Sequence, residues 1–281
     1  MKALIAGIGL MAVVMAARGM DAQYPDSVEV SCGKLEVRLG AATFWNMNRV
    51  IYDQLPISAD LTHAYWGTVF EFPEIGLIGS GHRDKDNNSE KIIDFQMFAD
   101  GKPVSLDGAA GPKKIVCGEF RMEKRAQVKD IEFNYGLTIR NDQLTETCTL
   151  KAARETPLKL MYNFMHPWSD QMTDYYIQVK EAVSKQGKFT TDEKFSHQDP
   201  FIWVALYNAN IGAGIVSKAA GEDVRLFLWD RKQYKKTYLC SFYRKTMPAG
   251  KEVTYKMKTD FFKESPDGWL NAAKEKANQL Q

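Results

Sequence analysis

Histidine is scarce in this chain, with four residues in 281. The four cysteines, Cys32, Cys117, Cys148 and Cys240, are spaced far too widely for a zinc-binding motif. Neither sign of charge dominates, because 37 Lys and Arg stand against 35 Asp and Glu, which argues against nucleic acid as the main partner. No apolar run beyond residue 22 reaches the ~20 residues that a spanning helix needs, so no lasting membrane anchor is expected.

Several sequence motifs are also missing. The chain has no nucleophile elbow, no phosphate-cradling loop and no dinucleotide fingerprint, and the glycines of IGAGIVSKAAG (211–221) lack the full spacing and a following helix. There is no low-complexity linker and no fixed-period repeat. We therefore expect one domain, spanning residues 23–281.

The amino terminus has the three-part pattern of a secretory signal peptide. Lys2 precedes a mostly apolar stretch, Ala3 to Ala17, and Arg18 with small or polar residues follows. This pattern predicts a signal peptide over residues 1–22, cut after Gly19 or Ala22, and a periplasmic or secreted protein. In such an oxidising compartment the four cysteines could form up to two disulfides, in three pairings, although Cys148 could equally be a buried small hydrophobe.

The body of the chain alternates in the manner of β-strands. Leu35, Val37 and Leu39 alternate with charged residues, which is typical of antiparallel strands with one buried face. The segments expected to be strands are 35–39, 48–52, 91–98, 115–122, 131–139, 144–152, 158–165, 175–179, 201–207, 211–217, 224–229, 237–243 and 253–258. So many antiparallel strands cannot stay in one flat sheet, so we expect a large sandwich. Only residues 265–281 indicate a helix, with Ser265 as N-cap and Pro266 at its first position.

Three segments of the chain carry motifs that belong together. The first runs from Ile78 to Leu106, the second from Pro157 to Gln171 and the third from Arg225 to Phe262. The residues of these motifs are Arg83, Asn87 or Asn88, Lys91, Ile92, Asp100 and Gly101; Pro157, Leu158, Leu160, Asn163, His166 and Trp168; and Pro248, Gly250 and Glu252. Together they resemble the galactose mutarotase (aldose 1-epimerase) superfamily. The resemblance implies an all-β fold, a large antiparallel β-supersandwich with a short C-terminal helix.

The chain departs from that family where catalysis is concerned. The histidine-glycine-glycine run after the hairpin is replaced by LDGAAGP (106–112), and the family's base glutamate is missing. The acidic residue nearest to the matching place is Asp230. Sugar epimerases, domains of glycoside hydrolases and polysaccharide lyases, and non-catalytic proteins share this fold, so the fold alone does not choose among them.

Opening a sugar ring requires an acid and a base. His166 suits the acid because the ordinary pKa of a histidine side chain, about 6.5, is close to the working pH, and Asp230 suits the base. Trp168 and Trp229 could then stack on a face of the sugar. We expect His166 and Arg83 to share one concave face; the alternative is that His166 caps a strand and both tryptophans are core residues.

A second group of candidates lies in and before the loop GSGHRDKDNN (79–88). A lyase needs a group that neutralises a uronate carboxylate, for which Arg83 or Asn88 is suited, and a base, for which His82, Tyr65 or His63 is suited. The alternating oxygen donors Asp84, Asp86, Asn88 and Glu90 make calcium a minor expectation. The EF-hand pattern fails there, because Ser89 replaces the glycine and Phe95 the bidentate glutamate. The basic run 231–236 indicates a groove for an acidic glycan or a lysine-protected edge strand.

Three functions follow from these observations. The first is an exported protein that binds or acts on a sugar by epimerase-like acid/base chemistry, with no cofactor. The second is a lyase of acidic polysaccharides, and the third is a non-catalytic glycan-binding protein.

Overall fold

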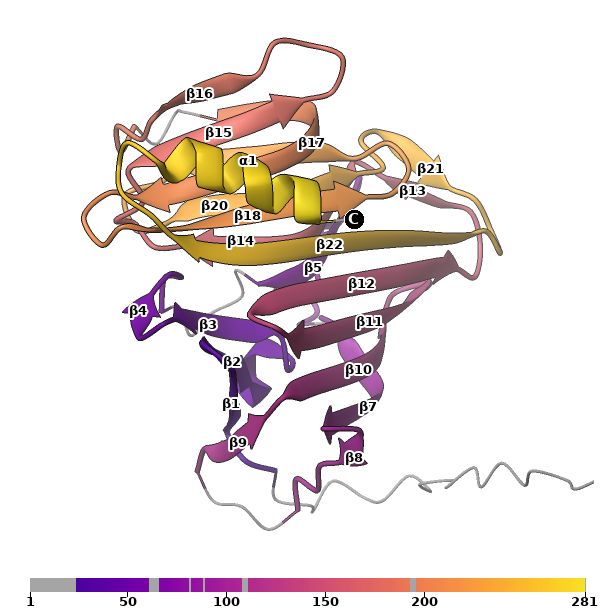
Figure 1. Cartoon of the computed structure of the whole chain (residues 1–281). Coiled ribbons are helices and arrows are strands. Elements are labelled where there is room, and N and C mark those ends of the chain that lie inside the picture. Colours follow the sequence, from indigo (N-terminus) through magenta and orange to yellow (C-terminus); the bar gives the residue numbers. More distant parts are fainter. Residues whose placement is uncertain are drawn as a thin grey trace, which may run out of the picture.

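The computed structural model describes residues 24–60, 66–80, 82–87, 89–107, 111–192 and 196–280. Strands make up almost all of its regular structure, and one helix, α1 (Trp269–Gln279), lies near the end (Figure 1). The strands are β1 (Ser27–Cys32), β2 (Leu35–Gly40), β3 (Met47–Tyr52), β4 (Leu55–Pro56), β5 (Gly67–Phe72), β6 (Gly76–Ile78), β7 (Lys91–Ala99), β8 (Lys102–Pro103), β9 (Lys113–Cys117), β10 (Glu119–Val128), β11 (Ile131–Arg140), β12 (Gln143–Ala152), β13 (Thr156–Leu158), β14 (Leu160–Trp168), β15 (Asp174–Val179), β16 (Lys185–Lys188), β17 (Ser196–Asn208), β18 (Ala213–Ala220), β19 (Arg225–Asp230), β20 (Lys235–Ser241), β21 (Lys245–Met247) and β22 (Glu252–Lys263). The expected all-β fold with a C-terminal helix is confirmed.

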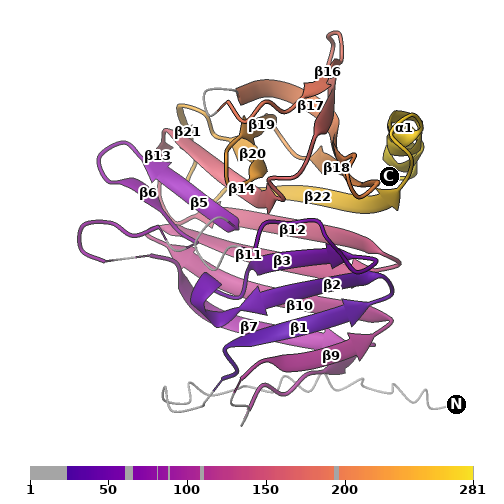
Figure 2. The ribbon, with the colours of Figure 1, turned by 90° about the vertical axis from the view of Figure 1, so that its left-hand side faces the viewer.

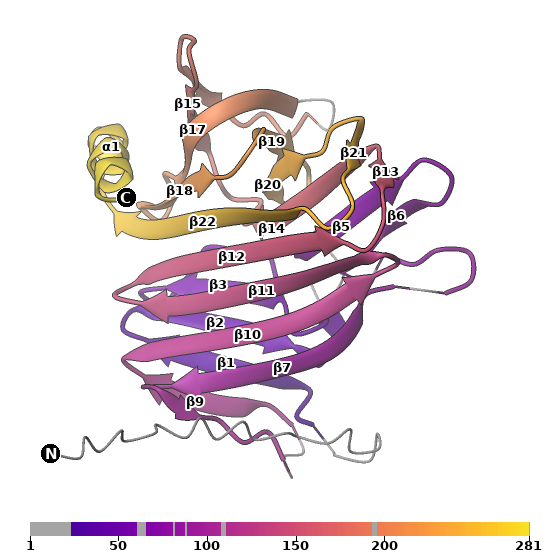
Figure 3. The same cartoon turned by 90° about the vertical axis from the view of Figure 1, so that its right-hand side faces the viewer.

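Two main sheets build the sandwich. The smaller has the order β4-β3-β2-β1-β9, and the larger has the order β6-β5-β14-β20-β19-β17-β18-β22-β12-β11-β10-β7-β8, with β15 and β16 attached at β17. The smaller sheet covers one face of the β10–β12 region, and the opposite face of that region is open (Figures 2 and 3). A hydrophobic core fills the space between them.

The larger sheet curls back on itself. The first residues of β17 pair with β19, whereas its later residues pair with β15 and β18. As a result β14 and β12, which have five strands between them in the sheet order, face each other across the core. Their contact is direct, because His166 Nε2 lies 2.6 Å from Glu146 Oε2.

Strict alternation explains the strands β10, β11 and β12. Their inward side chains are buried and mostly apolar, and their outward side chains are polar and accessible. Each buried Leu, Ile, Val or Phe contributes roughly 1.5–3 kcal/mol relative to its exposed state. The register keeps these inward positions opposite one another on all three strands.

Two expected strands differ from the observed ones. The segment 115–122 divides at Gly118 into β9 and β10, because the chain crosses there from the smaller sheet to the larger. Asp100 Oδ1 accepts the N–H groups of Gly118 and Glu119, both at 2.9 Å, and fixes this crossing. The basic run does not form an edge strand, because β20 lies between β14 and β19 and Lys235 is 1 % exposed.

Helix α1 begins later than expected. The Ser265 carbonyl accepts the N–H groups of Gly268 and Trp269, so residues 265–268 form a turn, and the Ser265 hydroxyl bonds Glu264 instead of capping the helix. Ala273, Ala277 and Leu280 pack against β17, β18 and β22. No helix among the described residues is long and apolar enough to cross a membrane. The predicted signal peptide lies outside the described residues.

Candidate functional site

A β-bulge in β14 determines where His166 points. Between Asn163 and His166 this strand has one residue more than its partner β20, and Phe164 has a left-handed φ of +48°. Because the side chains of a strand alternate between faces, one inserted residue reverses every face that follows it. Without the bulge His166 would share the face of Tyr162; with it, His166 faces the core and is completely buried.

Glu146 and Tyr135 hold His166 inside the sandwich. Glu146 Oε2 lies 2.6 Å from His166 Nε2, and Oε1 accepts the Tyr135 hydroxyl at 2.7 Å. A carboxylate can only accept hydrogen bonds, so Nε2 carries a proton. Burial, and then the charge of Glu146, raises the pKa of Tyr135 well above its ordinary value, so this hydroxyl stays a donor.

A buried ion pair lies beside this group. Lys124 Nζ is 2.7 Å from Glu90 Oε1, and both side chains are almost fully buried. The same ammonium donates to the carbonyl of Phe44 and to Asn46 Oδ1, each at 2.9 Å. Such a pair is expensive to desolvate, and its hydrogen bonds offset part of that cost. The interior therefore holds a connected set of polar side chains. They come from Glu90, just before β7, and from the strands β10, β11, β12 and β14.

Three polar atoms of this interior have no hydrogen-bond partner among the described residues: Nδ1 of His166, Nδ2 of Asn163 and Nε1 of Trp66. The rings of Trp66 and His166 are 5.6 Å apart, and Asn163 belongs to the same strand as His166. Buried polar atoms normally have partners. These three can therefore donate to, or accept from, a further small polar group.

Asp230 does not join His166. It is fully buried at the end of β19, with Oδ1 2.5 Å from Lys235 Nζ and Oδ2 accepting the N–H groups of Thr190 and Thr191, both at 2.8 Å. In the sheet register Asp230 lies opposite Lys235, whereas His166 lies opposite Thr237 on the far side of β20. The expectation that His166 and Asp230 flank one open cleft is wrong, because both side chains are buried and each has its own partner.

The two tryptophans lie on opposite faces of the sheet. Trp168 is buried beside His166, with ring centroids 5.1 Å apart, and its Nε1–H donates to Thr237 Oγ1 at 2.7 Å. Trp229 precedes Asp230 in a strand and so faces the other way, where Arg231 lies 4.2 Å from its ring centroid. The structure therefore does not place the two rings around one ligand, and Trp168 is a core residue.

The loop after β6 is separate from the His166 cluster. Arg83 is exposed, and its guanidinium donates to the carbonyl and the side chain of Asn87, at 3.2 and 3.3 Å. Because His166 is buried, the expected concave face shared by Arg83 and His166 is wrong. Asn88, Tyr65 and His63 lie outside the described residues, so their proposed roles stay predictions.

His82 predicts a dependence of stability on pH. Burial, and then the charge of Lys236, lowers the pKa of His82 below its ordinary value of 6.5. Between these two pKa values the unfolded chain binds more protons than the folded one, so stability falls as the pH drops below about 6.5. We expect the melting temperature to fall between pH 7.5 and 5.5, and to fall less in His82→Gln. Equal falls in both proteins would show that His82 does not contribute.

Two carboxylates of the acidic loop, those of Asp84 and Glu90, pair with different lysines. Glu90 turns inward to Lys124, and Asp84 Oδ2 pairs with Lys129 Nζ at 2.9 Å. Among the described residues no three His, Cys, Asp or Glu side chains form a group that could hold a metal ion. Asn88 lies outside the described residues, so the minor expectation of calcium at these alternating donors stays a prediction.

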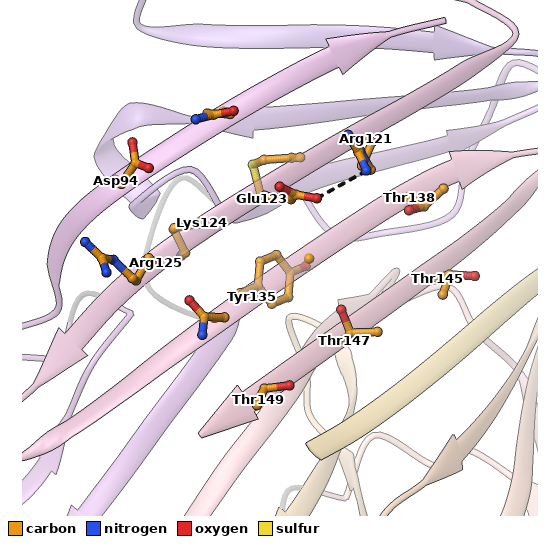
Figure 4. Close-up of a pocket in the computed structure, with 14 residues that line it drawn as sticks. Asp94, Arg121, Glu123, Lys124, Arg125, Tyr135, Thr138, Thr145, Thr147 and Thr149 are labelled. Atoms are coloured by element: carbon orange, nitrogen blue, oxygen red, sulfur yellow. Dashed lines mark ion pairs between the residues drawn. The ribbon is translucent and has the colours of Figure 1, made fainter. Parts of the chain in front are cut away.

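A hollow lies on the open face of β7, β10, β11 and β12, and we call it the outer groove (Figure 4). Its volume is about 630 Å³, within the range usual for small-molecule sites. Three cross-strand rows form its floor: Arg121, Thr138 and Thr145; Gln96, Glu123, Gly136 and Thr147; and Asp94, Arg125, Asn134 and Thr149. The sequence analysis did not single out these residues.

Gly136 opens the middle of the outer groove. It lies within β11 between Glu123 and Thr147, and a Cβ there would be 2.7 Å from Thr147 Oγ1. Glycine weakens a strand interior and often marks the close approach of a ligand. A lone glycine in the strand pattern EFNYGLTIR (132–140) was the one signal that the sequence offered for this site.

No protein-family model matches the chain, and no curated protein matches its sequence. Solved structures do match. A protein of Synechocystis sp. PCC 6803 has a TM-score of 0.55 at 7% identity, over 89% of this chain and 100% of that one. The galactose 1-epimerase of Lactobacillus acidophilus NCFM has a TM-score of 0.53 at 9% identity, over 83% and 93%. The fold is galactose mutarotase-like.

The same fold is found in a larger enzyme. The GH36 α-galactosidase AgaB of Geobacillus stearothermophilus has a TM-score of 0.50 at 8% identity, over 89% of this chain and 42% of that one. At such identities the likeness concerns the fold only. The galactose mutarotase-like fold expected from the three sequence segments is thus confirmed.

Proposed function

We propose that this protein is an exported carbohydrate-binding protein that holds a sugar in the outer groove. The observation that carries the proposal is the groove itself, an open hollow of about 630 Å³ floored by polar rows around Gly136. The galactose mutarotase-like fold supports a sugar as the ligand, because its structural neighbours include a galactose 1-epimerase and an α-galactosidase.

The groove offers the hydrogen-bonding groups that sugar hydroxyls need. Asn134 and Gln96 each provide both donors and acceptors, the threonine hydroxyls do the same, and the carboxylates of Asp94 and Glu123 accept. A hydroxyl is both donor and acceptor, so a floor of mixed character can satisfy several of them at once. The binding energy would then come from several hydrogen bonds of roughly 0.5–3 kcal/mol each.

The charge of the groove favours a neutral sugar over a polyuronate. Its two arginines are matched by two carboxylates on the same floor, Asp94 and Glu123. Each arginine also has a carboxylate nearby, since Arg121 is 3.3 Å from Glu123 and Arg125 is 3.9 Å from Glu132. No net positive charge therefore remains for an acidic glycan.

Epimerase-like chemistry is a second candidate, located at His166. The observation that favours it is the set of three buried polar atoms without described partners, of which His166 Nδ1 is one. Glu146 would fix the ring and stabilise an imidazolium while Nδ1 exchanges a proton with a sugar oxygen. For this chemistry a sugar would have to enter the interior of the protein. Binding in the outer groove does not require that step. Faster approach to anomeric equilibrium, followed by polarimetry on fresh α-D-galactose and α-D-glucose, would support it.

Gly136→Val tests the groove directly. The new side chain fills the middle of the floor, so affinity for a neutral sugar should fall about tenfold or more, equivalent to ~1.4 kcal/mol. Stability should change by less than about 1 kcal/mol, because the gain from replacing a strand glycine, about 0.5–1 kcal/mol, offsets part of the cost of displacing Thr147 Oγ1, which lies 2.7 Å from the new Cβ. Calorimetric titration with neutral mono- and oligosaccharides, together with thermal denaturation, measures both effects.

Gly118→Val is the matched control for this experiment. Gly118 is exposed at the crossing between the sheets and does not line the groove, and a Cβ there would be 3.4 Å from Asp100 Oδ1. This variant should bind sugar like the wild type. Equal affinity in Gly136→Val would move the site away from the groove, and a wild-type protein that binds no sugar would overturn the proposed function.

A further inference from the structure

Two of the four cysteines meet where the two sheets are joined. Cys32 ends β1 and Cys117 ends β9, and the parallel pairing of these strands places the two residues directly opposite each other. As thiols their sulfur atoms are 3.2 Å apart. Neighbouring strands lie about 4.8 Å apart, which is within the Cα separation that a disulfide requires.

The other two cysteines do not form a second pair of this kind. Cys148 is fully buried in the main core, and Cys240 is buried in a separate apolar cluster with Val69, Leu160 and Tyr238. Among the cysteines, all of which are described, only Cys32 and Cys117 form a sulfur–sulfur contact. The fold therefore singles out one pair, Cys32 and Cys117, and leaves Cys148 and Cys240 as two separate buried thiols.

We propose that Cys32 and Cys117 form a structural disulfide. The partly exposed Cys117 thiolate attacks a disulfide oxidant, such as oxidised glutathione, and releases one thiol. Cys32, as thiolate, then attacks the Cys117 sulfur of the mixed disulfide and releases the second thiol. The protein loses two protons and two electrons, and the oxidant's S–S bond is reduced to two thiols.

This bond would link β1 to β9 within the smaller sheet, next to the crossing into the larger sheet. Strand β9 is the edge of the smaller sheet and pairs only with β1, and Gly118 leads from it directly into β10 of the larger sheet. The two cysteines are 85 residues apart in the sequence, so the bond would close a long loop and strongly restrict the unfolded chain. Cys32 is 1% exposed, so once formed the bond would present little of its Cys32 sulfur to attacking thiolates.

The test uses the mature chain incubated with a mixture of oxidised and reduced glutathione. The intact mass should fall by about 2 Da, from the loss of two hydrogens. Digestion without reduction should yield one cross-linked peptide containing Cys32 and Cys117, and Cys148 and Cys240 should be alkylated once the protein is unfolded. Four alkylated cysteines, or a bond that involves Cys148 or Cys240, would overturn the assignment.

Thermal denaturation provides an independent measurement. Reduction should lower the melting temperature of the wild type by about 5–15 °C, the range expected from a disulfide of ordinary strength in a chain of this size. The double variant Cys32→Ser/Cys117→Ser should melt at the same temperature with and without reductant. A wild-type protein that is cross-linked yet insensitive to reductant would show that the bond is not structural. The peptide map uses the wild-type protein, so it does not depend on whether the double variant folds.

Discussion

His166→Ala should lower the free energy of unfolding by about 3–5 kcal/mol, the usual cost of truncating a large buried side chain and leaving its buried hydrogen-bond partner unsatisfied. The substitution leaves the Glu146 carboxylate inside the core with only the Tyr135 hydroxyl as partner, and it leaves a cavity beside Trp66 and Trp168. For a domain of this size the melting temperature should fall by roughly 10 °C. Thermal and chemical denaturation measure the effect.

The control for this prediction is Thr145→Ala, on the outer face of β12. It should change stability by no more than about 0.5 kcal/mol. Glu146→Gln combined with His166→Ala should lose less than the sum of the two single variants, because the residues contact each other. If His166→Ala melts like the wild type but abolishes mutarotation, the histidine serves chemistry and the second candidate function gains support.

Asp230→Ala should be equally damaging, again by about 3–5 kcal/mol. The substitution leaves the buried ammonium of Lys235 without its carboxylate partner. It also removes the acceptor of two backbone N–H groups, those of Thr190 and Thr191. Sugar affinity, corrected for the folded fraction, should stay within about twofold, because Asp230 does not line the outer groove. Denaturation and calorimetric titration on the same samples measure both quantities.

Asp230→Leu with Lys235→Met separates charge from packing. Replacing both partners of a buried ion pair by apolar residues is often neutral or stabilising, so this double variant should recover part of the lost stability. A double variant less stable than Asp230→Ala would show that Lys235 is held by its bond to the Arg231 carbonyl more than by Asp230. An Asp230→Ala protein of normal stability would contradict the structural role.

The sequence predicted most of the strands because alternation is a local signal. The segments 131–139 and 144–152 lie almost wholly within β11 and β12, where one face is buried and the other is wet. The division at Gly118 was not predictable in this way, since the segment 115–122 looks like one strand and β9 and β10 are told apart by their partner strands. Partner choice is a property of the whole fold.

The candidate site was harder to predict than the fold. His166 was expected to be open because its segment resembles the mutarotase pattern, and the bulge at Phe164, which turns His166 into the core, cannot be read from that pattern. The outer groove was missed because outward polar side chains, such as Asn134 and Gln96, are normal for a solvated sheet face. Only the curvature of the sheet, which depends on all of its strands, makes them line one hollow.

The position of β22 has a consequence for how the chain acquires its structure. This strand is the last in the sequence, yet it lies inside the larger sheet between β12 and β18. Until residues 252–263 arrive, β12 and β18 are two unpaired edges that can join other chains. The sheet therefore cannot close during synthesis, and its long-range pairing makes folding slow. During that interval β12 and β18 are the places where copies of the chain can pair with one another and aggregate.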